Sequence, residues 1–199
     1  MKRMKRNRTQ TELPNSRELE QELSRVRAES RSGWGTFKDC LTAVLVTAAA
    51  MVLLTAMLLP VMRIQGESMA PALNGGDVTI ALKHTELRRG DICFFYSGNR
   101  ILCKRIIGFA GDVIEMDEAG NVYVNGELLE EPYLADKDLG HCEIAFPYTV
   151  PEGTFFVMGD NREISRDSRS EEVGCVPEEQ MIGKLLLRVW PLSGFGTVA

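Results

Sequence analysis

Three short segments of the chain combine side chains that could take part in nucleophilic chemistry. The first spans residues 66–73 and places Ser68 between Gly66 and Pro71, where the chain leaves an extended segment. A serine at such a turn can expose its hydroxyl and its backbone N–H together, which suits a nucleophile. Serine near glycine and proline is also an ordinary turn residue, so this segment alone leaves both interpretations open.

The second segment, residues 103–112, carries a lysine within a predicted strand. Because side chains alternate between the two faces of a strand, Lys104 lies on the same face as Leu102 and Ile106. Burial between two apolar side chains disfavours the ammonium form and lowers the lysine pKa, and a neutral lysine is a competent base. The alternative is a lysine whose amine reaches past these neighbours into water.

The third segment, residues 159–169, is dense in Asp, Asn, Arg and Ser side chains. Its Asp and Arg residues could pair through two hydrogen bonds each and so brace a site. The same composition also fits a solvated loop, and the segment alone does not separate the two.

Short strands must position these segments. From residue 63 onward, alternating or β-branched apolar runs are separated by Gly-Asp and Asn-Gly turns, and Asn125-Gly126 is typical of a type I′ hairpin, in which both residues need positive φ. The predicted strands lie at residues 78–82, 92–96, 101–107, 122–124, 127–129, 154–158 and 185–190. A short helix is possible at 177–181, and a long irregular loop is expected at about 130–152. We therefore expect residues 63–199 to form an all-β, twisted and partly closed domain.

Residues 40–62 are predicted to cross a membrane as a single helix. These 23 residues carry no charge and lie between Asp39 and Arg63. A helix of that length reaches roughly 34 Å, enough for a hydrocarbon core of about 30 Å. Its threonines can bond back to helix carbonyls, and Pro60 is expected to bend the last turn. A cleaved signal peptide has a shorter apolar region of about 7–15 residues, and a buried helix of a soluble domain is a poorer fit, so a retained anchor is favoured.

The distribution of charge predicts an orientation for this anchor. Residues 1–39 carry 10 Lys/Arg and 6 Asp/Glu, whereas residues 40–199 carry 13 and 22. The basic residues near the span lie mostly on its N-terminal side: Arg25, Arg27, Arg31 and Lys38 precede it, and Arg63 alone follows. The positive-inside rule then places the tail, residues 1–39, in the cytoplasm and the β-rich domain outside.

The composition also bears on partners and ligands. In the basic tail, Asn15 and Glu18 are spaced as a capping box, and we expect a solvated helix near anionic membrane lipid. The acidic external part would repel phosphates, so nucleic acid is not an expected partner. The five cysteines show no paired zinc-type spacing, and no metal or cofactor is expected. Cys93 and Cys103 either face each other across a hairpin centred on Gly98 and form a disulfide, or pack as small apolar residues.

Taken in order after a membrane anchor, the three segments closely resemble the bacterial type I signal peptidases, membrane serine proteases that use a Ser/Lys dyad, in their Gram-positive-type branch. The resemblance covers roughly residues 40–199 and rests on an ordered set of motifs: the apolar span, Ser68-Met69-x-Pro71-x-Leu73, Gly90-Asp91-Ile92, Lys104-Arg105 with Gly111-Asp112, Gly159-Asp160-Asn161-Arg162 through Asp167-Ser168-Arg169, and Gly183-Lys184 with Arg188 and Trp190-Pro191. It implies a signal-peptidase-type catalytic domain on a single-pass plasma-membrane protein. The implied activity is removal of N-terminal signal peptides from secreted precursors through an acyl-enzyme, with cleavage after small residues.

The resemblance implies a role for each matching residue. Ser68 is the nucleophile, Lys104 is the general base, and Ser165 is the serine that orients the lysine. The other site residues are expected to brace the site or shape the wall beside the nucleophile: Asp160, Asp167, Arg169, Met69 and Pro71. Two positions depart from the family pattern. Ala72 stands where the family often has threonine, and Gly66 stands where one branch has a serine that donates to the oxyanion hole, which leaves the Ser68 N–H and another backbone donor or water.

Other interpretations are open at this point. The context of Ser68 is one residue away from the Gly-x-Ser-x-Gly elbow of α/β-hydrolases, but that fold needs alternating helices and a downstream Asp and His, and only His84 and His141 are present. The Ser/Lys autoprotease domain of repressor proteins has a related β fold but no membrane anchor. A non-catalytic, membrane-tethered β-domain could bind extended peptides by strand addition.

Overall fold

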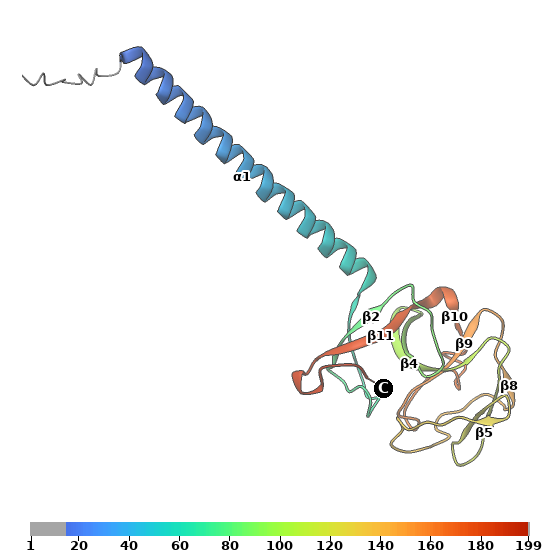
Figure 1. Cartoon of the computed structure of the whole chain (residues 1–199). Helices are drawn as coiled ribbons and strands as arrows, with labels where there is room; N and C mark the ends of the chain where they lie inside the picture. Colours follow the sequence, from blue (N-terminus) through green and yellow to red (C-terminus); the bar gives the residue numbers. More distant parts are fainter. Residues whose placement is uncertain (1–14, 199) are drawn as a thin grey trace, which may run out of the picture. The chain divides into compact units, whose positions relative to one another are not determined.

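The computed structural model describes residues 15–198; the first 14 residues of the predicted cytoplasmic tail, and Ala199, lie outside the described part. Within it, helix α1 (Ser16–Leu58) precedes a β-rich domain (Figure 1). The strands are β1 Val61–Arg63, β2 Val78–Leu82, β3 Ile92–Ser97, β4 Arg100–Phe109, β5 Val113–Met116, β6 Val122–Val124, β7 Glu127–Leu128, β8 Tyr148–Thr149, β9 Thr154–Met158, β10 Val176–Pro177 and β11 Met181–Trp190. Two short 3₁₀ helices, η1 (Glu178–Gln180) and η2 (Leu192–Gly194), flank β11.

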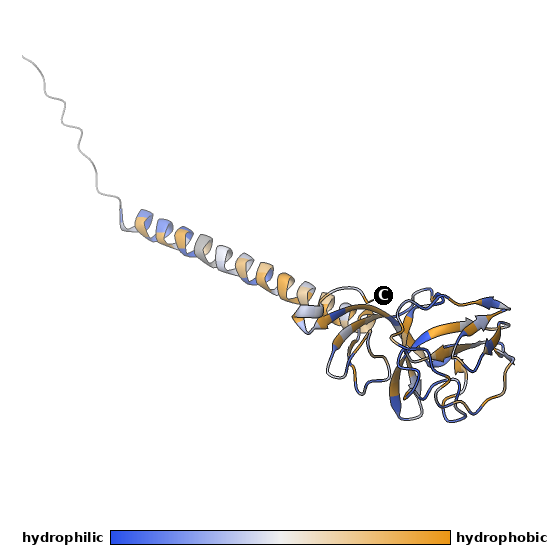
Figure 2. Ribbon diagram, turned by 90° about the horizontal axis from the view of Figure 1, so that it is seen from below, coloured by the Kyte–Doolittle hydropathy of each residue, from blue (hydrophilic) through white to orange (hydrophobic). Residues whose placement is uncertain are grey.

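Helix α1 contains both the predicted tail helix and most of the predicted span in one continuous element of 43 residues. At its start the Asn15 N–H donates to Glu18 Oε2 at 3.2 Å, which is one half of the predicted capping box. The hydroxyls of Thr42 and Thr47 donate to carbonyls four residues earlier, at 2.8 and 2.7 Å. Figure 2 shows hydrophobic residues along the second half of the helix, and α1 is long and apolar enough to cross a membrane.

The helix ends before the predicted span does, and this corrects the boundary drawn at residue 62. Leu58 is the last helical residue, and Val61 and Met62 belong to β1. Pro60 ends the helix instead of bending it, because proline disfavours helical backbone in the residue before it. The freed carbonyls of Leu58 and Pro60 accept the N–H groups of Lys83 and Ala81 at 3.0 Å.

The β-rich domain consists of two antiparallel sheets. The larger has the strand order β1-β2-β11-β3-β4-β9-β10, and the smaller has the order β7-β6-β5-β8. The strands at the two edges of the larger sheet, β1 and β10, are not paired with each other, so the described part forms no closed barrel. Figure 1 shows β5 and β8 at the opposite end of the domain from β2 and β11. The predicted all-β, partly closed domain is confirmed, and it has no alternating helices of the kind an α/β-hydrolase elbow requires.

Turn chemistry sets the register of the hairpins. Asn125 and Gly126 have φ of 54° and 80°, as the type I′ prediction requires. Between β3 and β4 the loop is Gly98-Asn99, so that Ser97 pairs with Arg100. This two-residue loop moves the pairing by one position from a hairpin centred on Gly98.

The disulfide hypothesis is therefore wrong. Cys93 pairs with Lys104, and Phe94 pairs with Cys103, so the two cysteine side chains lie on opposite faces of the sheet. Cys93 is buried in a cluster with Phe95 and Ile106, whereas Cys103 packs against a cluster that contains Ile64. Both cysteines are free. They pack as small apolar residues.

Candidate active site

Ser68 lies in a loop that closes on itself between β1 and β2. The neck of this loop, which we call the serine loop (residues 64–77), is formed by backbone hydrogen bonds from Ile64 N to Asp77 O and from Gly76 N to Ile64 O, at 2.8 and 3.0 Å. Within it, Leu73 N donates to Met69 O at 2.9 Å, one turn of helical bonding directly after the serine. Met69 and Leu73 are buried in the core, which fixes the turn and leaves Ser68 half-buried at the surface.

The Lys104 amine meets the Ser68 hydroxyl. Lys104 lies near the middle of β4, and its Nζ is 2.7 Å from Ser68 Oγ. Its side-chain neighbours on the same face, Leu102 and Ile106, both pack in one apolar cluster, as the strand period predicted. Lys104 is 3% exposed, so the amine does not reach bulk water.

Burial lowers the pKa of Lys104 from its ordinary value of 10.5. The negative charge of Asp167 opposes this shift, and the positive charge of Arg169 reinforces it. A lowered pKa favours the neutral amine, and in that form Lys104 can accept a proton from the serine hydroxyl, because a hydrogen bond already joins the two atoms.

The segment after β9 is buried and closely paired, which decides between the bracing and solvated interpretations. The Asp167 carboxylate accepts Nε of Arg169 at 2.8 Å and the backbone N–H of Gly159 at 2.9 Å. Burial raises the pKa of Asp167, but the hydrogen bonds and charge of Arg169 outweigh it and hold the pKa below its usual value. Asp167 and Arg169 are each fully buried, so this pair is a rigid support beneath the end of β9.

Gly159 is the point at which this segment touches the serine loop. A side-chain Cβ at this position would lie 2.5 Å from the Ser68 carbonyl oxygen and 2.2 Å from Ser165 Oγ. Only glycine permits that approach. The Asn161 N–H then donates to the Ser68 carbonyl at 3.1 Å.

The other predicted site residues take different positions. Asp160 lies in a bidentate pair with Arg105, at 2.9 and 2.7 Å; burial raises the pKa of Asp160 and the guanidinium opposes the rise. Ser165 is fully buried, and its Oγ has no hydrogen-bond partner within the described residues, Lys104 included. Pro71 is exposed and, with Asn161, lines a cavity of about 270 Å³ beside the serine loop.

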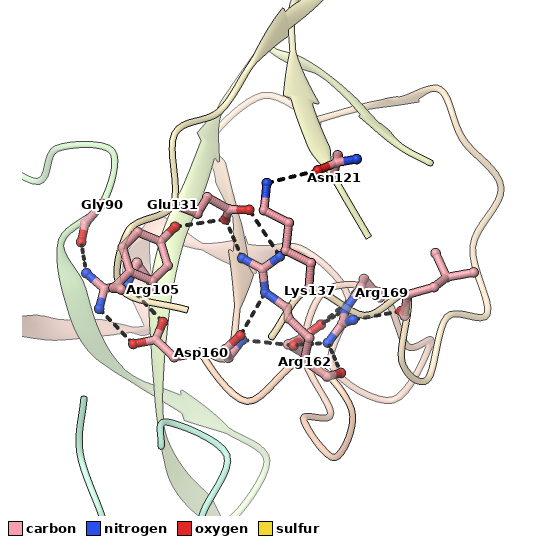
Figure 3. A network of polar contacts seen from close by, with 12 residues as sticks. Gly90, Arg105, Asn121, Glu131, Lys137, Asp160, Arg162 and Arg169 are labelled. Carbon is pink, nitrogen blue, oxygen red and sulfur yellow. Dashed lines mark hydrogen bonds and ion pairs between the residues drawn. The ribbon is translucent and has the colours of Figure 1, made fainter. Parts of the chain in front are cut away.

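Sequence reasoning missed two residues of the polar network near Asp160, Glu131 and Tyr133, and gave no role to a third, Arg162. Arg162 forms a buried ion pair with Glu131, and its Nε donates to the Gly159 carbonyl at 3.0 Å. The Tyr133 hydroxyl donates to Glu131 at 2.8 Å, and its ring lies 3.8 Å from the Arg105 guanidinium. Figure 3 shows the pair of Arg105 and Asp160 next to the pair of Glu131 and Arg162. The available signal was an acid and an aromatic on either side of Pro132, inside the stretch predicted to be an irregular loop.

A cleft of about 240 Å³ opens onto the dyad. Ser68 and Lys104 belong to its lining. The remaining lining residues come from the β3–β4 hairpin and from the segment after Gly159: Ser97, Arg100, Leu102, Ile164, Arg166, Glu172 and Val173. Neither histidine of the chain lines it. Ser68 and Lys104 therefore face one cleft that is large enough for part of a peptide.

Residues 37–190 match the family model for signal peptidase, peptidase S26. The chain belongs to this family. It is 36% identical over 152 residues to signal peptidase IB of Staphylococcus aureus, covering 66% of this chain and 78% of that protein. It is 31% identical over 174 residues to signal peptidase I of Streptococcus pneumoniae serotype 4, covering 68% and 84%.

A crystal structure of a signal peptidase I from Enterococcus faecalis V583 is 33% identical and covers 51% of this chain and 97% of its own, with a TM-score of 0.45. The family assignment confirms the resemblance seen in the motifs. The protein is accordingly a hydrolase and a serine protease of the signal peptidase I class, whose function is signal peptide removal.

Proposed function

We propose that the protein is a membrane-bound signal peptidase I in which Ser68 and Lys104 form the catalytic dyad. The observation that carries this proposal is the 2.7 Å contact between Lys104 Nζ and Ser68 Oγ, made by a lysine that is 3% exposed and lies at a cleft. Its substrates would be secretory precursors, from which it removes the N-terminal signal peptide.

The dyad would work in two steps. Lys104 takes the proton of the Ser68 hydroxyl as the oxygen attacks the scissile carbonyl, and the protonated lysine then gives that proton to the departing amine of the mature protein. The signal peptide remains as an ester on Ser68. Lys104, neutral again, takes a proton from a water molecule that attacks the ester. The protonated lysine then gives this proton to Ser68 Oγ as the ester bond breaks, which frees the signal peptide with a new carboxyl group and restores the serine.

A backbone group would stabilise the oxyanion. Within the described residues the Ser68 N–H donates no hydrogen bond, so it is available to the developing charge. Gly66 has a φ of 77° and offers no side-chain donor. The oxyanion would therefore rest on the Ser68 N–H and one further backbone donor or water.

The unpaired part of β4 supports binding of an extended substrate. Strand β9 pairs with β4 only from Arg105 to Phe109, whereas β3 occupies the other edge from Arg100 to Arg105. The edge of β4 at residues 100–104 therefore has no strand partner in the described structure, beside the serine loop. A substrate strand added here would present its scissile bond to Ser68.

Cleavage after small residues would follow from this geometry. Alternate side chains of an added strand point at the same wall, and the core cluster near Ser68 is already filled by Ile64, Met69 and Leu73. We expect small residues to be required one and three positions before the scissile bond. A peptide library cleaved equally well with Leu or Phe at the first of these positions would refute this.

The membrane part of the proposal concerns α1 and its orientation. Residues 1–39 would lie in the cytoplasm, the apolar part of α1 would span the bilayer, and the β-rich domain would lie outside. Protease added outside intact spheroplasts should then degrade the β-rich domain and spare an epitope at the N-terminus. Protection of the β-rich domain would reverse the orientation.

The dyad is tested with the full-length protein in detergent and a secretory precursor, with products identified by mass spectrometry. Ser68→Ala and Lys104→Met should each lower turnover by several orders of magnitude, and Lys104→Arg should not rescue it, because a guanidinium stays charged. Activity of the parent should rise with pH as Lys104 loses its proton. Near-parental cleavage by the Lys104→Met variant would overturn the dyad, and replacement of His84 or His141 should change little.

A further inference from the structure

Arg188 connects three separate parts of the domain. It lies on β11, and its side chain is only 20% exposed. One nitrogen, Nη1, donates to the Ala72 carbonyl at 3.2 Å and to the Asp77 carboxylate at 3.1 Å. Its Nε donates to the Gly194 carbonyl at 2.7 Å. Arg188 is part of the sequence motifs that resemble the family, but the site described above assigns it no role.

Both acceptors on one side of Arg188 belong to the serine loop. Ala72 lies in the turn that directly follows Ser68, and Asp77 forms the neck of the loop. The Asp77 carboxylate also accepts the Asn74 N–H at 3.1 Å, so the guanidinium and this backbone group meet on one oxygen. Arg188 therefore fixes the half of the loop that runs from the serine back to β2.

The dyad needs this connection because its two members have different supports. Lys104 lies on β4, and the pairing of β4 with β3 and of β3 with β11 makes it part of the same sheet as Arg188. Ser68 lies on a loop outside the strands. A charged side chain on that sheet, whose Nη1 donates to two groups of the loop, holds the distance between the hydroxyl and the amine.

We propose that Arg188 is a positioning residue for the reaction: it holds the serine loop so that Ser68 Oγ stays within hydrogen-bond reach of Lys104. This inference rests on the proposed function of the dyad. Loss of Arg188 would impair the attack on the scissile bond much more than the binding of the peptide, because the β4 edge and all the cleft-lining residues except Ser68 lie outside the serine loop.

The experiment compares Arg188→Met and Arg188→Lys with the parent as full-length proteins in detergent, on a signal-peptide substrate. We expect kcat to fall about tenfold or more in both variants while KM changes by about twofold or less, since a small misplacement of reacting atoms costs rate. Lysine should not rescue, because it lacks the planar fork that reaches several acceptors together.

The matched control is Lys184→Met. Lys184 lies on the same strand and forms a comparable half-buried ion pair with Asp91, at 3.3 Å, without contact to the serine loop. The Lys184→Met variant should lose about as much thermal stability as Arg188→Met, yet its kcat should stay that of the parent. Equal falls in kcat in Lys184→Met and Arg188→Met at equal loss of thermal stability would reduce Arg188 to a structural role and overturn the proposal.

Asp77→Asn separates the contact of Arg188 with the serine loop from its contact with Gly194. It replaces Arg188→Met as the test if that variant does not fold. This change weakens the contact to the serine loop and leaves the contact to Gly194 intact, so an intermediate fall in kcat supports the proposal and an unchanged kcat contradicts it. Ser68→Ala is measured in parallel. If it abolishes cleavage while the Arg188 variants keep full kcat, the dyad stands and only the role of Arg188 falls; if Ser68→Ala still cleaves, the proposed function itself fails.

Discussion

At the scale of single residues, the buried amine of Lys104 carries a cost in folding stability. Its pKa is lowered by burial, so at pH values between this lowered pKa and 10.5 the unfolded chain binds a proton that the native protein does not. Stability rises with pH wherever the unfolded state binds more protons, so the native protein gains stability as pH rises from the lowered pKa of Lys104 toward 10.5. The side chain that suits catalysis is therefore one that opposes folding at neutral pH.

Replacement of this lysine by methionine should reveal that cost. Lys104→Met should unfold at a higher temperature than the parent at pH 7, because methionine fills the same space without a group to desolvate. The difference in melting temperature should shrink as pH approaches 10.5, and scanning calorimetry across this range measures it. A constant difference at every pH would show that Lys104 is not perturbed by burial.

Glu131 and Arg162 differ from Lys104, because each of these buried side chains has a partner of opposite charge. The two side chains are 0% and 1% exposed. Glu131→Met alone leaves Arg162 charged and without its carboxylate, and should lower the free energy of unfolding by about 3–5 kcal/mol. Denaturant titration of the full-length protein measures this.

The double variant Glu131→Met, Arg162→Met is the control for that experiment. It should be more stable than Glu131→Met, because no uncompensated charge is left buried. A double variant less stable than the single one would mean that Arg162 gains its stability from the Gly159 carbonyl and not from Glu131.

The sequence predicts the surroundings of a single side chain well where the alternation of side chains along a strand determines which face it lies on. Lys104 lies between apolar neighbours as its alternation requires, and the dense segment after Gly159 is paired as its composition allowed. The ion-pair partners of the buried charged residues were not predicted. Arg105 pairs with Asp160 and Arg162 with Glu131, across 55 and 31 residues of sequence, and the spacing of charges along a chain does not encode contacts that depend on tertiary packing.

At the scale of elements, the end of β9 determines how closely the serine loop can approach. Gly159→Ala would place a methyl group against the Ser68 carbonyl and the Ser165 side chain, and both belong to buried or hydrogen-bonded surroundings that cannot yield. We expect turnover to fall by about 10²-fold, since a shift of reacting atoms by the order of 1 Å has that effect. Steady-state cleavage of a signal-peptide substrate measures it.

Gly108→Ala is the matched control for this prediction. Gly108 lies on β4, and a Cβ at this position would also meet a close neighbour, Ile114 Cδ1 at 2.7 Å, but that neighbour is the end of a flexible side chain. It should keep its turnover. Equal losses in the two variants would point to a general effect on the sheet.

Elements were predictable where side-chain alternation or turn chemistry is strong. The hairpin at Asn125-Gly126 and the strands around Ile80, Phe94 and Val157 follow from those signals. Strands β1, β8 and β10 have only two or three residues, which is too short for a recognisable alternation of side chains. They form through pairing with neighbouring strands, so the local sequence does not predict them. The register of β3 and β4 is set by a two-residue loop, Gly98-Asn99. The prediction assumed a hairpin centred on Gly98, so its register was wrong by one position.

At the scale of the whole molecule, the structure decides where the anchor can be removed. The compact unit that contains the site begins at Leu54, and β1 lies ahead of the serine loop and pairs with β2. Residue 63, the boundary drawn from the sequence, falls inside β1. A cut there removes one support of the loop neck together with the anchor, so loss of activity after such a cut would say nothing about the membrane.

Two truncations separate the anchor from the fold. Removal of residues 1–57 keeps β1 and the carbonyls of Leu58 and Pro60 that pair with the chain after β2. This protein should cleave short soluble peptides within about threefold of the parent and lose far more activity on precursors held in a bilayer, because tethering raises the effective concentration of the site at the membrane. Removal of residues 1–64 should lower both activities and the melting temperature, because β1 and the Ile64 pairing at the loop neck are lost. Rates on both substrates in detergent and in vesicles measure the contrast, and equal losses on the two substrates after removal of residues 1–57 would mean that α1 does not serve to place the site.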